Sequence, residues 1–211
     1  MAASLLHLVR HGEVHNPEGI LYGRLAGFGL TELGKRMAAA AAKELAGHDI
    51  RALYSSPLQR AQESAAPWAA DFDLSIRTDE RLIEPTNRFE GGTTAFGIGV
   101  LLTPRVWPWI INPWRPSWGE PYAQVIQRML SILGEAWAAN EGEVVLVSHQ
   151  MPIVMVQRRL AGKRPMHDPR SRRCHLSSIT TLRREGDGFV EVGYRDVSSE
   201  LLAQSIDEGA V

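Results

Sequence analysis

The sequence holds a single cysteine, Cys174, among 211 residues. One thiol excludes an internal disulfide and any metal site built from several thiolates. An excess of one charge is missing too, since the net charge is −1, which provides no overall field to attract nucleic acid or an anionic membrane. We therefore expect a reducing compartment and no nucleic-acid partner, and any bound anion must be held by a local cluster of cations.

Long hydrophobic runs are also missing. No stretch of about twenty apolar residues is available to span a bilayer. The apolar start at residues 5–6 follows no Lys or Arg and ends at Arg10, which is unlike a signal peptide. We expect a soluble, cytoplasmic protein with no stable membrane insertion.

The chain is long enough for one large domain, and its 44% of hydrophobic residues can form a substantial core. Apolar runs of strand length alternate with helical patterns. We predict strands at residues 4–9, 50–54, 74–78, 143–147, 176–183 and 189–194, and helices at residues 31–46, 57–70, 121–140 and 152–161. This alternation favours a three-layer α/β/α sandwich with a mostly parallel mixed sheet. The domain covers residues 1–197, and the acidic residues 198–211 are expected to form a flexible tail.

Three of the predicted strands end on side chains suited to phosphate chemistry. Arg10 and His11 follow the first, Arg60 lies just beyond the second, and His149 follows the strand at 143–147. Because the carboxyl ends of parallel strands share one edge of a sheet, these residues are expected to meet there. Two guanidiniums can bind phosphate oxygens, and nearby cations keep an imidazole neutral and nucleophilic. Gly12 is expected to let the backbone approach a bound oxyanion closely.

Four ordered motifs carry a family resemblance: LVRHGE at 8–13, LTELG at 30–34, YSSPLQRA at 54–61 and VSH at 147–149. Together they resemble the histidine phosphatase superfamily, in its phosphoglycerate-mutase-like branch. The resemblance implies a phosphoglycerate-mutase-like fold and hydrolysis of a small phosphorylated substrate, with no cofactor and no metal. A mutase that returns the phosphate to a sugar acid, or a non-catalytic module that binds phosphorylated ligands, is an alternative.

The resemblance also implies roles for individual residues. His11 would be the nucleophile that becomes phosphorylated, and Arg10, Arg60 and His149 would form the phosphate pocket. Glu84 matches the family's proton donor, which protonates the leaving alkoxide and then activates water. Three further phosphate contacts are expected, of which the last stands where the family usually has glycine: Gly12, Asn16 and Gln150.

Simpler interpretations remain for several of these residues. Glu84 has two acidic neighbours, Glu80 and Glu90, and any of the three could be an ordinary solvated loop acid. His7, His11 and His15 recur every four residues, which on a helix would suggest a metal site. Here the first lies in a predicted strand and the last in a loop, so we expect no metal. The basic segment 167–175 is either a solvated loop or a second anion contact.

An unusual insertion is predicted at residues 86–120. It carries four tryptophans, at positions 107, 109, 114 and 118, within a Pro- and Gly-rich stretch. Such a segment is too long and too apolar for a plain connector. We favour a lid over the pocket, with a homodimer interface second and contact with a membrane or an apolar partner third.

Overall fold

The structure is a computed structural model, and it describes residues 2–92, 119–197 and 199–207. Strands within these ranges form one sheet with the order β3-β2-β4-β1-β5-β6. The strands are β1 (Leu5–Arg10), β2 (Ile50–Ser55), β3 (Ile76–Thr78), β4 (Glu143–Ser148), β5 (Ile179–Glu185) and β6 (Gly188–Arg195). Strands β1 to β4 run parallel, and β5 and β6 add an antiparallel hairpin beside β1. The predicted mixed, mostly parallel sheet is confirmed.

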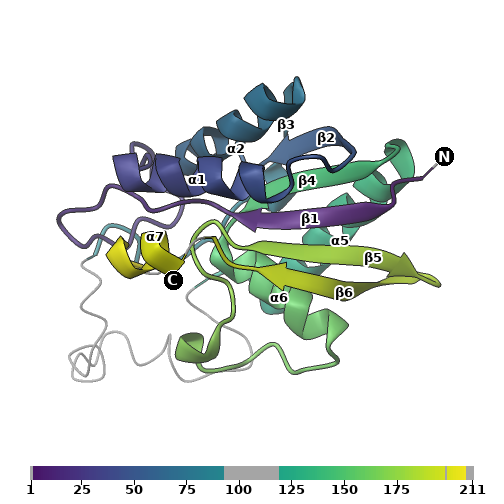
Figure 1. Cartoon of the computed structure of the whole chain (residues 1–211). Coiled ribbons are helices and arrows are strands. Elements are labelled where there is room, and N and C mark those ends of the chain that lie inside the picture. Colours follow the sequence, from purple (N-terminus) through teal and green to yellow (C-terminus); the bar gives the residue numbers. More distant parts are fainter. Residues whose placement is uncertain (1, 93–118, 198, 208–211) are drawn as a thin grey trace.

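Helices cover both faces of this sheet (Figure 1). Helices α1 (Glu32–Glu44) and α2 (Gln59–Phe72) lie on one face, and α5 (Tyr122–Ala139) and α6 (Gln150–Leu160) lie on the other. Short elements are η1 (Glu80–Leu82), η3 (Pro169–Ser171) and α7 (Ser199–Gln204). The three-layer sandwich predicted from the alternating pattern is therefore the observed architecture.

The alternation of side chains along the strands separates two hydrophobic cores. Leu8 of β1 and Leu146 of β4 belong to the core under α5 and α6. Their neighbours Val9 and Val147 point the other way, into the core under α1 and α2. All four are buried, as expected for parallel strands covered on both faces. The side chains at the strand ends are thus positioned by a sheet that helices cover on both faces.

Helix α1 begins as its sequence predicts. Thr31 is the N-cap, and its Oγ1 accepts a hydrogen bond from the Gly34 amide at 2.8 Å. Gly34 also lies against the loop that follows β1. A Cβ atom on Gly34 would lie 2.1 Å from the Glu13 carbonyl oxygen, and one on Gly12 would lie 2.4 Å from the Gly34 carbonyl oxygen. These two glycines let α1 and the β1 loop approach within backbone contact, and the expected approach of Gly12 to a bound oxyanion stays a prediction.

The C-terminal segment differs from the flexible tail that we expected. Residues 199–204 form helix α7, whose Leu201 and Leu202 pack against the core under α1 and α2. Figure 1 shows α7 beyond the carboxyl end of β1. Apolar contact explains the difference, because the composition of this segment hid two leucines that reach the core. We expected a flexible segment because its residues are acidic, and these two leucines outweigh that composition.

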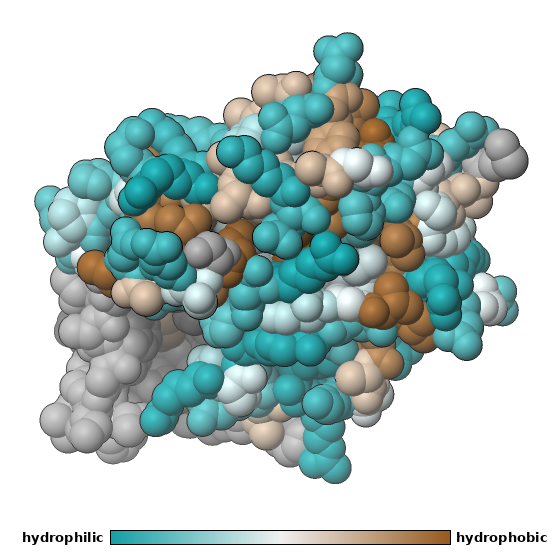
Figure 2. All heavy atoms as spheres, viewed as in Figure 1, coloured by the Kyte–Doolittle hydropathy of each residue, from teal (hydrophilic) through white to brown (hydrophobic). Residues whose placement is uncertain are grey.

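The surface is ordinary where it is described. The face in Figure 2 is mostly hydrophilic, with small, separate hydrophobic patches. Large hydrophobic side chains that are exposed in the described ranges are Leu25, Met166, Val192 and Ile206. No described helix is both long enough and apolar enough to cross a membrane. The four tryptophans of the predicted insertion lie outside the described residues, so its role as a lid or an interface stays a prediction.

Candidate functional site

The carboxyl ends of β1 and β4 bring the two predicted histidines together. The His11 amide donates to the Ser148 carbonyl at 3.1 Å, which continues the β1–β4 pairing beyond the sheet. His149 then forms the N-cap of α6. The two imidazole centroids lie 5.2 Å apart, and both side chains are fully buried. Residues 138 positions apart in sequence thus share one site, as the strand-end argument predicts.

His11 is held as a neutral imidazole with one nitrogen available. Its Nδ1 donates to the Gly12 carbonyl at 2.8 Å, which assigns the proton to that nitrogen. Burial, followed by the nearby Arg60 and Arg10 charges, lowers the His11 pKa well below its ordinary value. Among the described residues, Nε2 is buried with no hydrogen-bond partner. A lone pair on that atom is the expected state of a nucleophile.

His149 is oriented by a serine that sequence reasoning left without a role. Ser56 Oγ lies 2.7 Å from His149 Nε2 and also accepts from the Leu58 amide at 3.4 Å. We assign the serine hydrogen to Nε2, which places the imidazole proton on Nδ1. That Nδ1 lies 3.7 Å from Oε2 of Glu84. Burial lowers the His149 pKa, with Arg60 as the next cause, so the ring is neutral. It presents an N–H to the site.

Glu84 is distinguished from the other two candidate acids by its surroundings. It is fully buried, whereas Glu80 is exposed and Glu90 Oε1 accepts a hydrogen bond from the Asn87 amide at 3.0 Å. Burial raises the pKa of Glu84 to about 7, against the opposing effect of four arginines, of which Arg60 is the strongest. Neither carboxylate oxygen has a hydrogen-bond partner among the described residues. These properties suit a group that both gives and takes a proton near neutral pH.

The backbone around Glu84 is fixed from two sides. Ser148 Oγ, at the end of β4, donates to the Leu82 carbonyl at 2.7 Å. Arg24 Nε donates to the carbonyl of Glu84 itself at 2.6 Å. The loop after η1 is therefore tied to the same sheet edge that carries His11 and His149. This explains why a loop acid can be placed accurately enough for proton transfer.

Arg60 is positioned in the first turn of α2, as expected. Its Nη2 donates to the Gly23 carbonyl at 2.7 Å, and its guanidinium lies 4.7 Å from the centroid of the Tyr22 ring. The side chain is 1% exposed. Burial lowers its pKa, but a guanidinium remains charged at any physiological pH. Arg60 therefore supplies a fixed positive charge beside both histidines.

Arg10 already binds a carboxylate in this structure. Its Nη1 and Nη2 donate to the two oxygens of Asp207 at 2.7 and 2.6 Å, and Nη1 also donates to the Cys174 carbonyl at 2.7 Å. Burial opposes the charge on Arg10, but the Asp207 carboxylate outweighs it and raises the Arg10 pKa. A paired geometry of this kind also suits two oxygens of a phosphate group. Asp207 therefore occupies the donors that a phosphate would use.

Two predicted phosphate contacts have other partners. The Asn16 side chain both accepts from the Ile20 amide and donates to its carbonyl, each at 2.9 Å, and so closes its own loop. Gln150 Oε1 accepts from Arg172 Nη1 at 2.9 Å. Phosphate contacts from Asn16 and Gln150 stay predictions. In the basic segment 167–175, most residues are exposed, as a solvated loop predicts, whereas Arg172 is partly buried and contacts Gln150.

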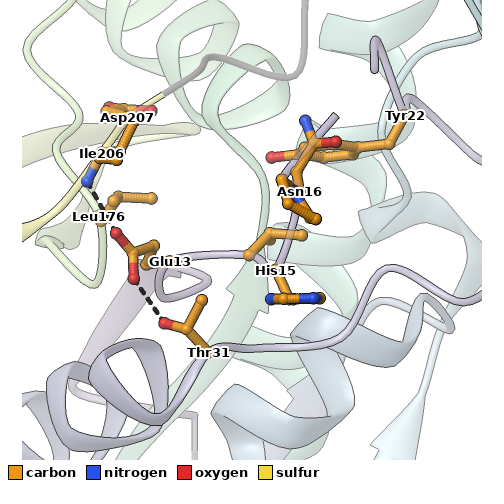
Figure 3. A pocket seen from close by; sticks show the side chains of 10 residues that line it. Glu13, His15, Asn16, Tyr22, Thr31, Leu176, Ile206 and Asp207 are labelled. Atoms are coloured by element: carbon orange, nitrogen blue, oxygen red, sulfur yellow. Dashed lines mark hydrogen bonds between the residues drawn. The ribbon is translucent and has the colours of Figure 1, made fainter. Parts of the chain in front are cut away.

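A pocket of about 200 Å³ lies beside the cluster (Figure 3). The loop after β1 forms one part of its wall, and Leu176, Ile206 and Asp207 form another. Figure 3 shows Glu13 bridging these two parts. It accepts from Thr31 Oγ1 at 2.5 Å and from the Ile206 amide at 2.7 Å. Asp207 lines this pocket and also binds Arg10, so it stands between the pocket and the buried cluster.

Asp207 and Ser56 are the functional candidates that sequence reasoning missed. Asp207 lies 197 positions from Arg10, and no local pattern connects the two. Ser56 lies inside the YSSPLQRA motif, but the motif gave it no role in the site. Its actual partner, His149, lies 93 positions away. Neither contact has a signal in a single sequence.

Comparisons with known proteins agree with this geometry. A family model described as "Histidine phosphatase superfamily (branch 1)" matches residues 6–197. An uncharacterised protein of Mycobacterium tuberculosis is 53% identical over 190 residues, which cover 90% of this chain and 94% of that protein. Phosphoserine phosphatase 1 of Hydrogenobacter thermophilus is 31% identical over 152 residues, with 70% and 72% covered. The structure of a mycobacterial glucosyl-3-phosphoglycerate phosphatase with VO3 has a TM-score of 0.73 at 26% identity, covering 92% of this chain and all of that one.

Proposed function

The chain belongs to the histidine phosphatase superfamily, branch 1, and from this premise we propose that it hydrolyses phosphate monoesters through a phosphohistidine on His11, without a metal. One observation carries the proposal. His11 Nε2 is buried, and the Gly12 contact keeps the imidazole proton on Nδ1, so Nε2 carries a lone pair. The cations Arg60 and Arg10 lie nearby. A nucleophilic nitrogen between two guanidiniums is what transfer of a phosphoryl dianion requires.

In the first step, His11 Nε2 attacks phosphorus as the ester P–O bond breaks. Arg10 and Arg60 bind the non-bridging oxygens and balance the charge that develops on them. The Nδ1–H of His149 is placed to donate to a phosphate oxygen. Glu84, whose raised pKa leaves it largely protonated at slightly acidic pH, gives its proton to the leaving alkoxide.

In the second step, water attacks the phosphohistidine. The ionised Glu84 takes a proton from this water as its oxygen bonds to phosphorus, and the P–Nε2 bond breaks to regenerate neutral His11. One carboxyl group thus gives a proton and recovers one in each cycle. A pKa of about 7 allows both roles, because neither protonation state is strongly disfavoured near neutral pH.

Paired phosphate binding through the terminal nitrogens of Arg10 involves a change at the C-terminal segment. Asp207 takes both of these nitrogens, so a phosphate dianion that uses them must displace this carboxylate, whereas Arg10 Nε is buried with no partner among the described residues. The Asp207 side chain is 35% exposed, whereas that of Arg10 is fully buried. The carboxylate can therefore leave towards solvent, while the guanidinium stays in place.

We propose a small substrate rather than a phosphoprotein. The reacting side chains are buried, which favours a phosphate group on a compact molecule. Two similar proteins have names that specify small phosphate esters, phosphoserine and glucosyl-3-phosphoglycerate. These names support the substrate class and leave the individual substrate to a screen of phosphorylated metabolites.

The test is direct trapping of the intermediate. Purified protein in excess chelator is mixed with an aryl phosphate labelled in the phosphoryl group and quenched in alkali, where phosphohistidine survives. We expect label on the wild-type protein and none on His11→Ala. His48→Ala, which removes a histidine from the loop between α1 and β2, is the matched control and should label normally. Turnover that is unchanged in His11→Ala would refute the proposal.

The mutase alternative shares the phosphohistidine and differs in the acceptor. A 2,3-bisphosphoglycerate-dependent phosphoglycerate mutase of Thermoplasma acidophilum is 47% identical over 78 residues, which is 36% of this chain. Labelled 3-phosphoglycerate distinguishes the two reactions. Release of inorganic phosphate supports hydrolysis, and formation of 2-phosphoglycerate would show a mutase.

A further inference from the structure

A second cluster of histidines lies away from the reacting groups. His7 Nε2 and His48 Nδ1 each lie 2.8 Å from the same oxygen, Oε2 of Glu143. The three ligand-type atoms all lie within 4.8 Å of one another. They come from three separate segments: strand β1, the loop between α1 and β2, and the first residue of β4. Two imidazoles and a carboxylate whose ligand atoms converge in this way are a typical ligand set for zinc and similar divalent ions.

The surroundings orient these side chains before any ion arrives. His7 is 1% exposed and its Nδ1 lies 3.0 Å from Thr181 Oγ1. Without an ion, the Nε2–H of His7 donates to Glu143 and Nδ1 accepts from the Thr181 hydroxyl. When an ion takes the place of the Nε2 proton, the imidazole can carry its proton on Nδ1 and donate to this hydroxyl, as metal-bound histidines do to their outer partners. The amide of Glu143 donates to the Asp49 carbonyl at 2.8 Å and fixes the His48 loop against β4.

Size and access also suit a metal ion. Zinc bonds of about 2.1 Å in a tetrahedral site place ligand atoms roughly 3.4 Å apart. The side chains would need to spread by about half an ångström from the present 2.8 Å contacts. The His48 side chain is 32% exposed and that of Glu143 is 14% exposed. An ion can therefore enter from solvent, and water can fill a fourth position.

The cluster is separate from the proposed catalytic machinery. Glu143 is the first residue of β4, whereas His149 follows its last residue. Six residue steps separate Glu143 from His149, a distance of about 20 Å at the usual rise per residue in a strand. Arg195 is a cation close enough to His7 to interact with it electrostatically. It donates to the Glu44 carbonyl at 3.2 Å and would oppose, but not block, binding of an ion.

We propose that His7, His48 and Glu143 form a binding site for one divalent ion of the zinc class, which ties β1, β4 and the α1–β2 loop together. The site is structural rather than catalytic, and hydrolysis at His11 does not need it. A bound ion links segments that are otherwise joined by hydrogen bonds to one carboxylate oxygen. Binding should therefore stabilise the folded protein.

The experiment titrates chelator-treated, dialysed protein with zinc chloride in a calorimeter. Because zinc could also bind the His11–His149 pair, all variants carry His11→Ala. We expect one zinc ion per chain, and an affinity at least tenfold lower after His48→Ala or Glu143→Gln. His15→Ala removes an exposed histidine outside the cluster and should leave the affinity unchanged.

Thermal unfolding provides a second readout that is independent of the calorimeter. Zinc should raise the melting temperature of the parent and of His15→Ala, and not that of His48→Ala. In the presence of His11, aryl phosphate hydrolysis in chelator should be equal for wild type and His48→Ala. The proposal is overturned if the parent protein binds no zinc at micromolar concentrations, or if His48→Ala binds it as tightly as the parent.

Discussion

Replacing Glu84 with glutamine tests both the burial of this carboxyl and its proposed chemistry. Burial raises its pKa from 4.5 to about 7, which corresponds to roughly 3 kcal/mol at 1.36 kcal/mol for each unit. In the folded protein the carboxyl keeps its proton up to about pH 7, whereas the unfolded chain loses it near the ordinary value. The unfolded state therefore binds fewer protons in this window, and wild-type stability falls as pH rises.

Glutamine has no charge to bury, so Glu84→Gln avoids this loss. We expect the free energy of unfolding of the variant, relative to wild type, to increase by up to roughly 3 kcal/mol between acidic pH and pH 8. Urea denaturation across this pH range measures the difference. Two stability curves that run parallel from pH 4 to pH 8 would refute the raised pKa.

The same variant separates proton donation from nucleophilic attack. An alkyl phosphate needs a proton on its leaving oxygen, whereas a nitrophenolate leaves readily without one. Rapid-mixing measurements should show a loss of about 10²–10⁴ in the phosphorylation step for an alkyl phosphate, and a much smaller loss for the aryl phosphate. For wild type, alkyl phosphate kcat/KM should decline above about pH 7. Equal losses for both substrates would contradict a donor role for Glu84.

Three other substitutions test contacts that the structure shows. Asp207→Asn weakens the charged competitor for Arg10, so inorganic phosphate should inhibit about tenfold more tightly, a gain of about 1.4 kcal/mol; weaker inhibition would show that Asp207 supports Arg10 instead. Gly34→Ala places a Cβ against the Glu13 carbonyl and should lower the free energy of unfolding by about 2 kcal/mol or more in urea. Its control is Gly134→Ala in α5, where nothing lies within 4 Å of the new Cβ and a gain of up to about 1 kcal/mol is expected; similar effects at both glycines would argue against the backbone contact. Ser56→Ala removes the hydroxyl that orients His149 and should lower kcat about tenfold with little change in KM; an unchanged kcat would leave Ser56 with only a structural role.

Much of the fold follows from local patterns in the sequence. The Thr31 cap, the alternating strands and helices and the hairpin around residues 185–188 all lie where their residues predict them. These features depend on neighbours a few positions apart, which one sequence displays directly. Residues 199–204 form α7 rather than part of a flexible tail, because Leu201 and Leu202 contact a distant core. In a short acidic stretch of sequence these two leucines look unremarkable.

The sequence by itself determined the family, the order of the layers and the side chains that the strand ends bring together, which are Arg10, His11, Arg60 and His149. The family resemblance added Glu84. The family and the strand-end side chains can be inferred from the order of motifs and strands along the chain, because the carboxyl ends of parallel strands share one edge of a sheet. Only the tertiary structure decided which partners these side chains meet. Ser56 orients His149, Asp207 occupies Arg10, and His7 joins His48 and Glu143 rather than the other histidines of its motif. Such contacts arise where packing brings distant segments together, and burial there sets the pKa values on which the chemistry depends.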